Sequence, residues 1–271
     1  VEDQERRYRL YIHGAGCTPE RVQVRAVDLL TEASLTREAT LRSDPVPPGP
    51  AGICGGRVPP GQPGFTAAHP WCHSTEVAGL VRLGPGIVYI PETRVFQPGE
   101  RVEIRPGTTL QMLPRASLVF LGPVRAEGTE AAPIRIRGSD WGGVALQGPG
   151  TAGSTLTQVI VEGGSRPVWG LGVFPAMVNI HDTREISIDG LRLQEAQGTE
   201  DALHVAYVDD LRFAGIHIER PPGDGVDLEF STGTITGLTV LDAGDEALDF
   251  MGAELTVEDA VLVGFGGSGI S

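Results

Sequence analysis

The chain has 271 residues, enough for one large domain or two smaller ones, and its 38 glycines and 21 prolines indicate short strands and tight turns. Its net charge of −14 argues against nucleic acid or an anionic membrane surface as a partner. All 21 basic residues are arginine, which excludes chemistry that needs a lysine amine, and no apolar run approaches the ~20 residues of a membrane span.

Residues 1–43 form a partial N-terminal β-region in our interpretation, because RYRLYIHG and RVQVRAVDLL alternate apolar and polar residues at a period of two. Residues 44–73 are rich in proline and glycine and are typical of a linker. A disulfide between Cys54 and Cys72 would stabilise this stretch in an oxidising compartment. Three free or buried thiols, with Cys17 as the third, are the alternative.

A short amphipathic segment, TEVAGLVRL, follows the linker. Ser74 can cap the N-terminus of a helix there, and Gly84-Pro85 would end it. We therefore predict a helix over residues 74–83. It would cover the first coil of the sheet structure that follows, because an open sheet end exposes strand edges.

From about residue 86 onward, apolar-x-apolar triplets such as VNI, LHV, VDL and LDF recur between glycine, aspartate and proline. If Asn179, His204, Asp227 and Asp249 are equivalent, the spacings are 25, 23 and 22 residues, a length that suits one coil of a solenoid. Both neighbours of each of these residues are apolar, and a second apolar ladder stays in phase with the first. We predict an all-β fold, a right-handed parallel β-helix over residues 74–271 that includes the cap helix.

The sequence ends at GFGGSGIS, directly after a coil. A bare solenoid end exposes strand edges and core. We therefore expect the β-helix to continue in the natural protein, or this open C-terminal end to be covered by a further domain of the same chain or by another subunit.

Residues 80–271 resemble known proteins. The turn and strand Pro106-Gly107-Thr108-Thr109-Leu110, followed by A-S-L, a G-T turn and a W-G-G strand, resemble the first coils of secreted bacterial β-helix proteins of the pectate-lyase-like superfamily. The acidic segments EDALHV, DGVDLEF and GDEALDF are similar to a subgroup found beside spore-coat-type kinase domains in large cell-surface proteins. The resemblance implies a secreted or cell-surface location. It carries no activity over, and the alginate-epimerase Asp-Pro-His-Glu motif is absent.

One outward column of polar residues is the strongest candidate site. Period two turns Asn179, His204, Asp227 and Asp249 away from the core on rungs ~4.8 Å apart, and His181 and Glu229 face the same way. Carboxylates this close raise one another's pKa or recruit a cation. The candidate catalytic residues are Asp227, Asp249, His204 and Glu229. The alternative is a structural ladder of stacked polar side chains.

A second acidic row, Asp201, Asp224 and Glu246, lies at the preceding turn and provides candidate ligands for Ca²⁺, which takes 6–8 oxygen ligands. Aspartate after glycine is also an ordinary turn former, which is the alternative. In a lyase, Ca²⁺ would neutralise a uronate carboxylate, whereas a hydrolase would need two carboxylates ~5–9.5 Å apart. Candidate substrate-binding residues are Arg184, Arg212, His181 and Trp169, although solvated arginine is the ordinary state.

Two functional hypotheses follow. The first is an extracellular carbohydrate-active or carbohydrate-binding β-helix, a polysaccharide lyase or glycoside hydrolase if it is an enzyme, which acts on acidic polysaccharide through the carboxylate column. The second is a non-catalytic structural or adhesive surface module of a larger secreted protein. The acidic column favours the first hypothesis, and the missing family motifs favour the second.

Overall fold

The computed structural model describes residues 8–13, 22–28, 34–39, 79–170 and 174–271. The chain divides into two compact units, Val1–Gln62 and Pro63–Ser271. The predicted linker and the three cysteines, Cys17, Cys54 and Cys72, lie outside the described residues, so both thiol alternatives stay open.

The smaller unit contains the strands that the alternating N-terminal sequence predicts. Three strands form an antiparallel sheet in the order β1-β2-β3: β1 (Tyr8–His13), β2 (Val22–Asp28) and β3 (Ser34–Ala39). Neighbouring strands in the sequence pair directly, as in a meander.

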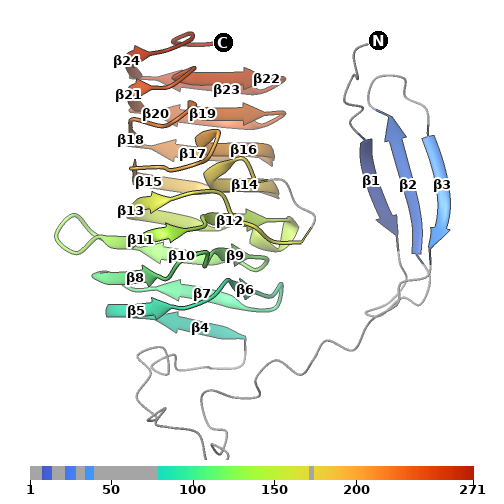
Figure 1. Ribbon diagram of the computed structural model, residues 1–271, viewed down its shortest axis with the longest axis horizontal. Coiled ribbons are helices and arrows are strands. Elements are labelled where there is room, and N and C mark those ends of the chain that lie inside the picture. Colours follow the sequence, from blue (N-terminus) through green and yellow to red (C-terminus); the bar gives the residue numbers. More distant parts are fainter. Residues whose placement is uncertain (1–7, 14–21, 29–33, 40–78, 171–173) are drawn as a thin grey trace, which may run out of the picture. The chain divides into compact units, whose positions relative to one another are not determined.

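The larger unit is a parallel β-solenoid of about eight turns, and successive turns stack from β4 to β24 along one axis (Figure 1). In the described part of the chain, the only helical element is a 3-10 turn, η2 (Pro149–Thr151). None of the described residues lies in a helix long and apolar enough to cross a membrane. The predicted β-helix architecture is therefore confirmed.

The strands of the solenoid stack into three faces, all with parallel pairing. The first face contains β4 (Leu80–Leu83), β7 (Arg101–Ile104), β10 (Val124–Glu127), β17 (Leu211–Ala214), β20 (Thr232–Thr236) and β23 (Glu254–Glu258). The second face contains β5 (Gly86–Ile90), β8 (Thr108–Met112), β11 (Ile134–Trp141), β18 (His217–Glu219), β21 (Thr239–Ala243) and β24 (Val261–Phe265). The long strands β13 (Thr155–Gly164) and β15 (Ser187–Gln194) pair with both of these faces.

The third face carries the candidate site. It contains β6 (Arg94–Phe96), β9 (Leu118–Phe120), β12 (Val144–Gln147), β14 (Ala176–Arg184), β16 (Asp201–Asp209), β19 (Asp224–Glu229) and β22 (Leu248–Met251), which pair in that order. These strands form a separate seven-stranded sheet because none of them pairs with a strand of the other two faces.

The apolar ladders that defined the repeat form the core. Leu203, Val226 and Leu248 are register partners on β16, β19 and β22, and each is 0% exposed. On the first face, Ile188 pairs with Phe213 in the same way, and both are buried. The predicted alignment of coils is therefore correct, because a shift of one residue would have turned these side chains outward.

The predicted cap helix over residues 74–83 is wrong where the structure describes it. Leu80–Leu83 is strand β4, which pairs in parallel with β7, and residues 74–78 lie outside the described residues. Val81 and Leu83 are each 6% exposed and point into the core. The apolar spacing of this short segment fits a helix and a strand equally well, and pairing with β7 decides for the strand.

Candidate functional site

The predicted polar column lies on the third face, in the predicted register. Asn179 on β14 pairs with His204 on β16, His204 pairs with Asp227 on β19, and Asp227 pairs with Asp249 on β22. Because the apolar neighbours of each residue occupy the core, the four polar side chains point away from it.

The column is more enclosed than the sequence predicts. Asn179 is 0% exposed and His204 7%. Phe174 stacks on the ring of His181 with 5.6 Å between the ring centroids. Trp169, a predicted sugar contact, packs instead against the small apolar cluster to which Phe174 belongs. Sequence reasoning missed the contact of Phe174 with His181, since the alternation of strand residues gives no signal for a contact made by a residue outside a strand.

Asn179 has a structural role in the column. Its side-chain oxygen accepts a hydrogen bond from the main-chain N–H of Ala176 at 3.1 Å. Its amide nitrogen donates to the carbonyl oxygens of Ala176 at 2.6 Å and Val144 at 3.4 Å. These bonds satisfy the buried amide with the neighbouring backbone, so this rung of the column is part of the scaffold.

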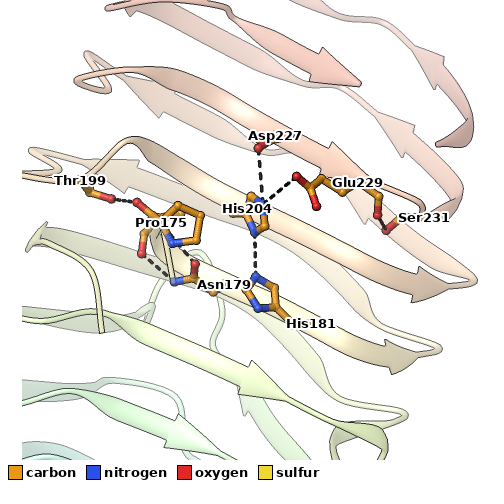
Figure 2. A network of polar contacts seen from close by, with 9 residues as sticks. Pro175, Asn179, His181, Thr199, His204, Asp227, Glu229 and Ser231 are labelled. Carbon is orange, nitrogen blue, oxygen red and sulfur yellow. Dashed lines mark hydrogen bonds and ion pairs between the residues drawn. The ribbon is translucent and has the colours of Figure 1, made fainter. Parts of the chain in front are cut away.

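Four side chains of β14, β16 and β19 form a group that we call the His–carboxylate cluster: His181, His204, Asp227 and Glu229 (Figure 2). A hydrogen bond of 2.7 Å joins Nε2 of His181 to Nδ1 of His204. On the other side of the same ring, Nε2 of His204 lies 3.4 Å from Oδ2 of Asp227 and 4.0 Å from Oε1 of Glu229. The ring of His204 therefore lies between a second imidazole and two carboxylates.

The two histidines of the cluster differ in their affinity for a proton. Burial, together with the charge of His204, lowers the pKa of His181 to about 3. Burial also disfavours charge on His204, but the neighbouring carboxylates of Glu229 and Asp227 outweigh this effect and raise its pKa. His181 is thus the neutral member of the pair at neutral pH, and His204 is the member with the higher affinity for a proton.

Two carboxylates of the site hold protons more tightly than usual. Burial raises the pKa of Asp227 to about 6, with further contributions from Glu229 and Asp249, while His204 opposes the shift. Burial raises the pKa of Asp201 to about 7, helped by the charges of Asp227 and Asp224. The charges of neighbouring acids contribute to both shifts, but burial is the larger cause.

The predicted calcium row lies together in the structure: Asp201 is the register partner of Asp224, and the main-chain N–H of Glu246 donates a hydrogen bond to the carboxylate of Asp224. Asp224 and Glu246 gather with Asp245, and their carboxylate oxygens lie within 4.8 Å of one another. Asp201 is 5% exposed, and its charge interacts with Asp227, Asp224 and His204. Sequence reasoning missed Asp245, although Gly244 directly before it is the same turn signal that precedes Asp224.

The two arginines predicted to bind a carboxylated sugar do not join the cluster. Arg184 is exposed and lies 3.8 Å from the carboxylate of Glu185. Arg212 is also exposed and forms a 2.6 Å ion pair with Asp210. These are local surface pairs, in which solvent screens the charges.

Comparisons with family models, curated proteins and solved structures find no protein that matches this chain. The site is therefore interpreted from its own chemistry. A histidine beside carboxylates with raised pKa values can hold and transfer a proton, and the same donor set can bind a cation. The side chains of Asp227 and Glu229 are 17% and 23% exposed, so the cluster meets solvent through these two carboxylates.

Proposed function

We propose that this protein is an extracellular carbohydrate-active β-solenoid that acts on an acidic polysaccharide at the His–carboxylate cluster. The observation that carries the proposal is the buried ring of His204, which lies between His181 and the carboxylates of Asp227 and Glu229. A purely structural core does not need such a group, because burying ionisable side chains costs free energy. The proposed location and substrate class draw on the family resemblance of the coils.

The roles follow from exposure and proton affinity. Asp227 has a pKa raised to about 6, so a fraction of it is protonated near neutral pH and can act as a general acid. Glu229 meets solvent beside it and would act as the base. His204 lies behind both carboxylates and would exchange protons with them. Asp249, on the next rung, would contact the substrate at the edge of the site.

Calcium is the cation that the resemblance suggests, and the donor set fits it only in part. Asp224, Asp245 and Glu246 offer three carboxylates, whereas Ca²⁺ takes 6–8 oxygen ligands. One carboxylate oxygen of Asp224 already accepts a 2.9 Å hydrogen bond from the main-chain N–H of Glu246. We therefore derive no step of the proposed reaction through calcium.

The proposal is tested on polygalacturonate and alginate, with a neutral glucan for comparison. Binding is measured by affinity electrophoresis, and turnover by new reducing ends and by the absorbance of unsaturated uronates, which only a lyase produces. We expect Asp227→Asn and Glu229→Gln to abolish turnover. Asp189→Asn, which removes the same charge from an exposed position on β15, should leave it unchanged. Equal turnover in all of the variants would refute the proposed roles.

A non-catalytic surface module is the second candidate function, and Asn179 favours it. Because the backbone satisfies this buried amide completely, at least one rung of the column serves the fold alone. If the whole column is structural, no glycan binds. The double variant Asp227→Asn with Asp249→Asn would then be as stable as the wild type or more stable, since it removes stacked negative charges.

A further inference from the structure

We propose that His204, Asp227 and Glu229 bind a divalent transition-metal ion, with Zn²⁺ as the preferred ion, and that His181 is the positioning residue of this site. The three side chains come from consecutive strands, β16 and β19, of the most regular part of the third face. One ligand atom from each, an imidazole nitrogen and two carboxylate oxygens, lies within 4.8 Å of the others.

The distance between His204 and Asp227 suits a shared metal ion better than a direct hydrogen bond. Nε2 of His204 and Oδ2 of Asp227 are 3.4 Å apart, which exceeds the about 3.2 Å limit of a good N–H···O bond. Two ligands bonded to Zn²⁺ at about 2.1 Å in tetrahedral geometry lie about 3.4 Å apart. Oε1 of Glu229 is 4.0 Å from the same nitrogen, so its partly buried side chain needs to move by only about half an ångström.

His181 provides a second observation that points to a metal. A histidine that binds a metal through one ring nitrogen almost always donates the N–H of the other nitrogen to a fixed partner. Nδ1 of His204 makes such a contact, at 2.7 Å, with Nε2 of His181. With the proton on Nδ1 of His204, the lone pair on Nε2 points at the two carboxylates. The ring of His181 is held in turn by its stack on Phe174.

The donor set and its charge select the type of ion. Two carboxylates carry two negative charges, which a divalent cation neutralises. The imidazole ligand disfavours Ca²⁺ and Mg²⁺, which prefer oxygen, and suits Zn²⁺. Three protein ligands with one remaining position are the arrangement of a zinc site that is open to a water or a substrate. Because Asp227 and Glu229 are the exposed members of the cluster, the remaining position would face solvent.

With the ion bound, Asp227 and Glu229 would be ligands and not the acid and base described above. The ion could then bridge the cluster and a uronate carboxylate, which would explain how an acidic protein binds an acidic glycan. That last step rests on the proposed function, whereas metal binding does not. The two are distinguishable because metal binding is measured without any glycan. Zinc binding without glycan binding would leave the metal site standing and overturn the proposed substrate.

The test uses the full chain after treatment with EDTA. Zn²⁺ binding is measured by isothermal titration calorimetry, and Co²⁺ is added separately as a spectroscopic probe. We expect one Zn²⁺ per chain, a higher unfolding temperature in the presence of Zn²⁺, and the visible absorbance of four-coordinate Co²⁺. Ca²⁺ at the same concentration should give neither a comparable shift nor competition. Absence of the Co²⁺ absorbance, or equal binding of Ca²⁺, would overturn the proposal.

Variants assign the ion to these residues. His204→Gln, Asp227→Asn and Glu229→Gln should each weaken Zn²⁺ binding by more than the about 10–100-fold expected for the positioning variant His181→Phe. Asp245→Asn is the matched control, because it removes a carboxylate from the neighbouring acidic cluster. If a variant at a buried position does not fold, Glu229→Gln, at a partly exposed position, still tests whether these residues bind the ion. Unchanged affinity in Glu229→Gln, or an equal loss in Asp245→Asn, would reject the site.

Discussion

At the scale of single residues, Asp201 is the clearest case of a buried charge in this protein. Its side chain is 5% exposed, and burial together with Asp227 and Asp224 raises its pKa from 3.8 to about 7. The folded state therefore binds a proton more tightly than the unfolded state does. The stability that this proton provides is complete below about pH 4 and is lost as the pH rises through about 7.

We predict that Asp201→Asn stabilises the protein at about pH 8 and has little effect at about pH 4, because the amide stays neutral at both pH values. This pKa difference of about three corresponds to about 4 kcal/mol of folding free energy. Water near the half-buried neighbours screens the charges and reduces the expected gain in the free energy of unfolding to about 1–2 kcal/mol. Urea unfolding in the presence of EDTA at the two pH values measures this change in the free energy of unfolding. Asp209→Asn, at an exposed position of the same strand, is the control. A destabilisation of the same size at both pH values would contradict the prediction.

Phe230 is a second residue whose conformation makes a specific prediction. It follows Glu229 directly, has a φ of 45°, and stacks on Tyr207, which has a φ of 57°, with 5.1 Å between the ring centroids. Bulky residues rarely adopt this left-handed conformation, whereas glycine adopts it freely. The following coil has Gly252 there, with a φ of 64°.

We predict that Phe230→Gly is more stable than Phe230→Ala by about 1 kcal/mol, the reverse of the usual order within a strand. Both variants lose the ring stack, so only the backbone strain distinguishes them. Thermal unfolding of the two variants side by side measures the difference. If alanine proves equal to glycine or better, the left-handed conformation at this turn does not occur in solution.

At the scale of strands, the sequence determined the register but not the surroundings of the site. The third face was predictable because Leu203, Val226 and Leu248 must share the core, which fixes the residues between them as outward. The stacking of Phe174 on His181 was not predictable, since Phe174 lies outside the strands whose alternation defines the register. The strand β4 was missed because four residues are too few to distinguish a period of two from a period of 3.6.

The core ladder supports a prediction about packing. Leu203 is 0% exposed and lies between strands on both sides of β16. Leu203→Ala should destabilise the solenoid by about 2–5 kcal/mol, because it removes transfer free energy and leaves a cavity. Leu121→Ala, at a partly buried position outside this core, should cost less. Denaturant unfolding followed by circular dichroism measures both. Equal small losses would show that this ladder is not tightly packed.

At the scale of the whole molecule, the solenoid is a one-dimensional stack in which each coil contacts only its neighbours, so stability can vary along its axis. The burial of the strands varies in that way. Seven of the nine residues of β16 are buried, whereas four of the five residues of β24 are exposed. Val261, Val263 and Phe265 on β24 are 51%, 55% and 43% exposed.

We predict that amide hydrogens of β22 to β24 exchange with solvent faster than those of β14 and β16, since local opening of the last coils exposes little additional apolar surface. Hydrogen–deuterium exchange with peptide-level mass spectrometry measures this gradient. Zn²⁺ adds a second signal, because an ion bound at His204, Asp227 and Glu229 links β16 to β19 and should slow exchange in these two strands more than in β24. Uniform protection along the axis would instead show that the coils unfold as a single cooperative unit. If Zn²⁺ slowed exchange equally in all strands, the result would contradict binding of the ion between β16 and β19.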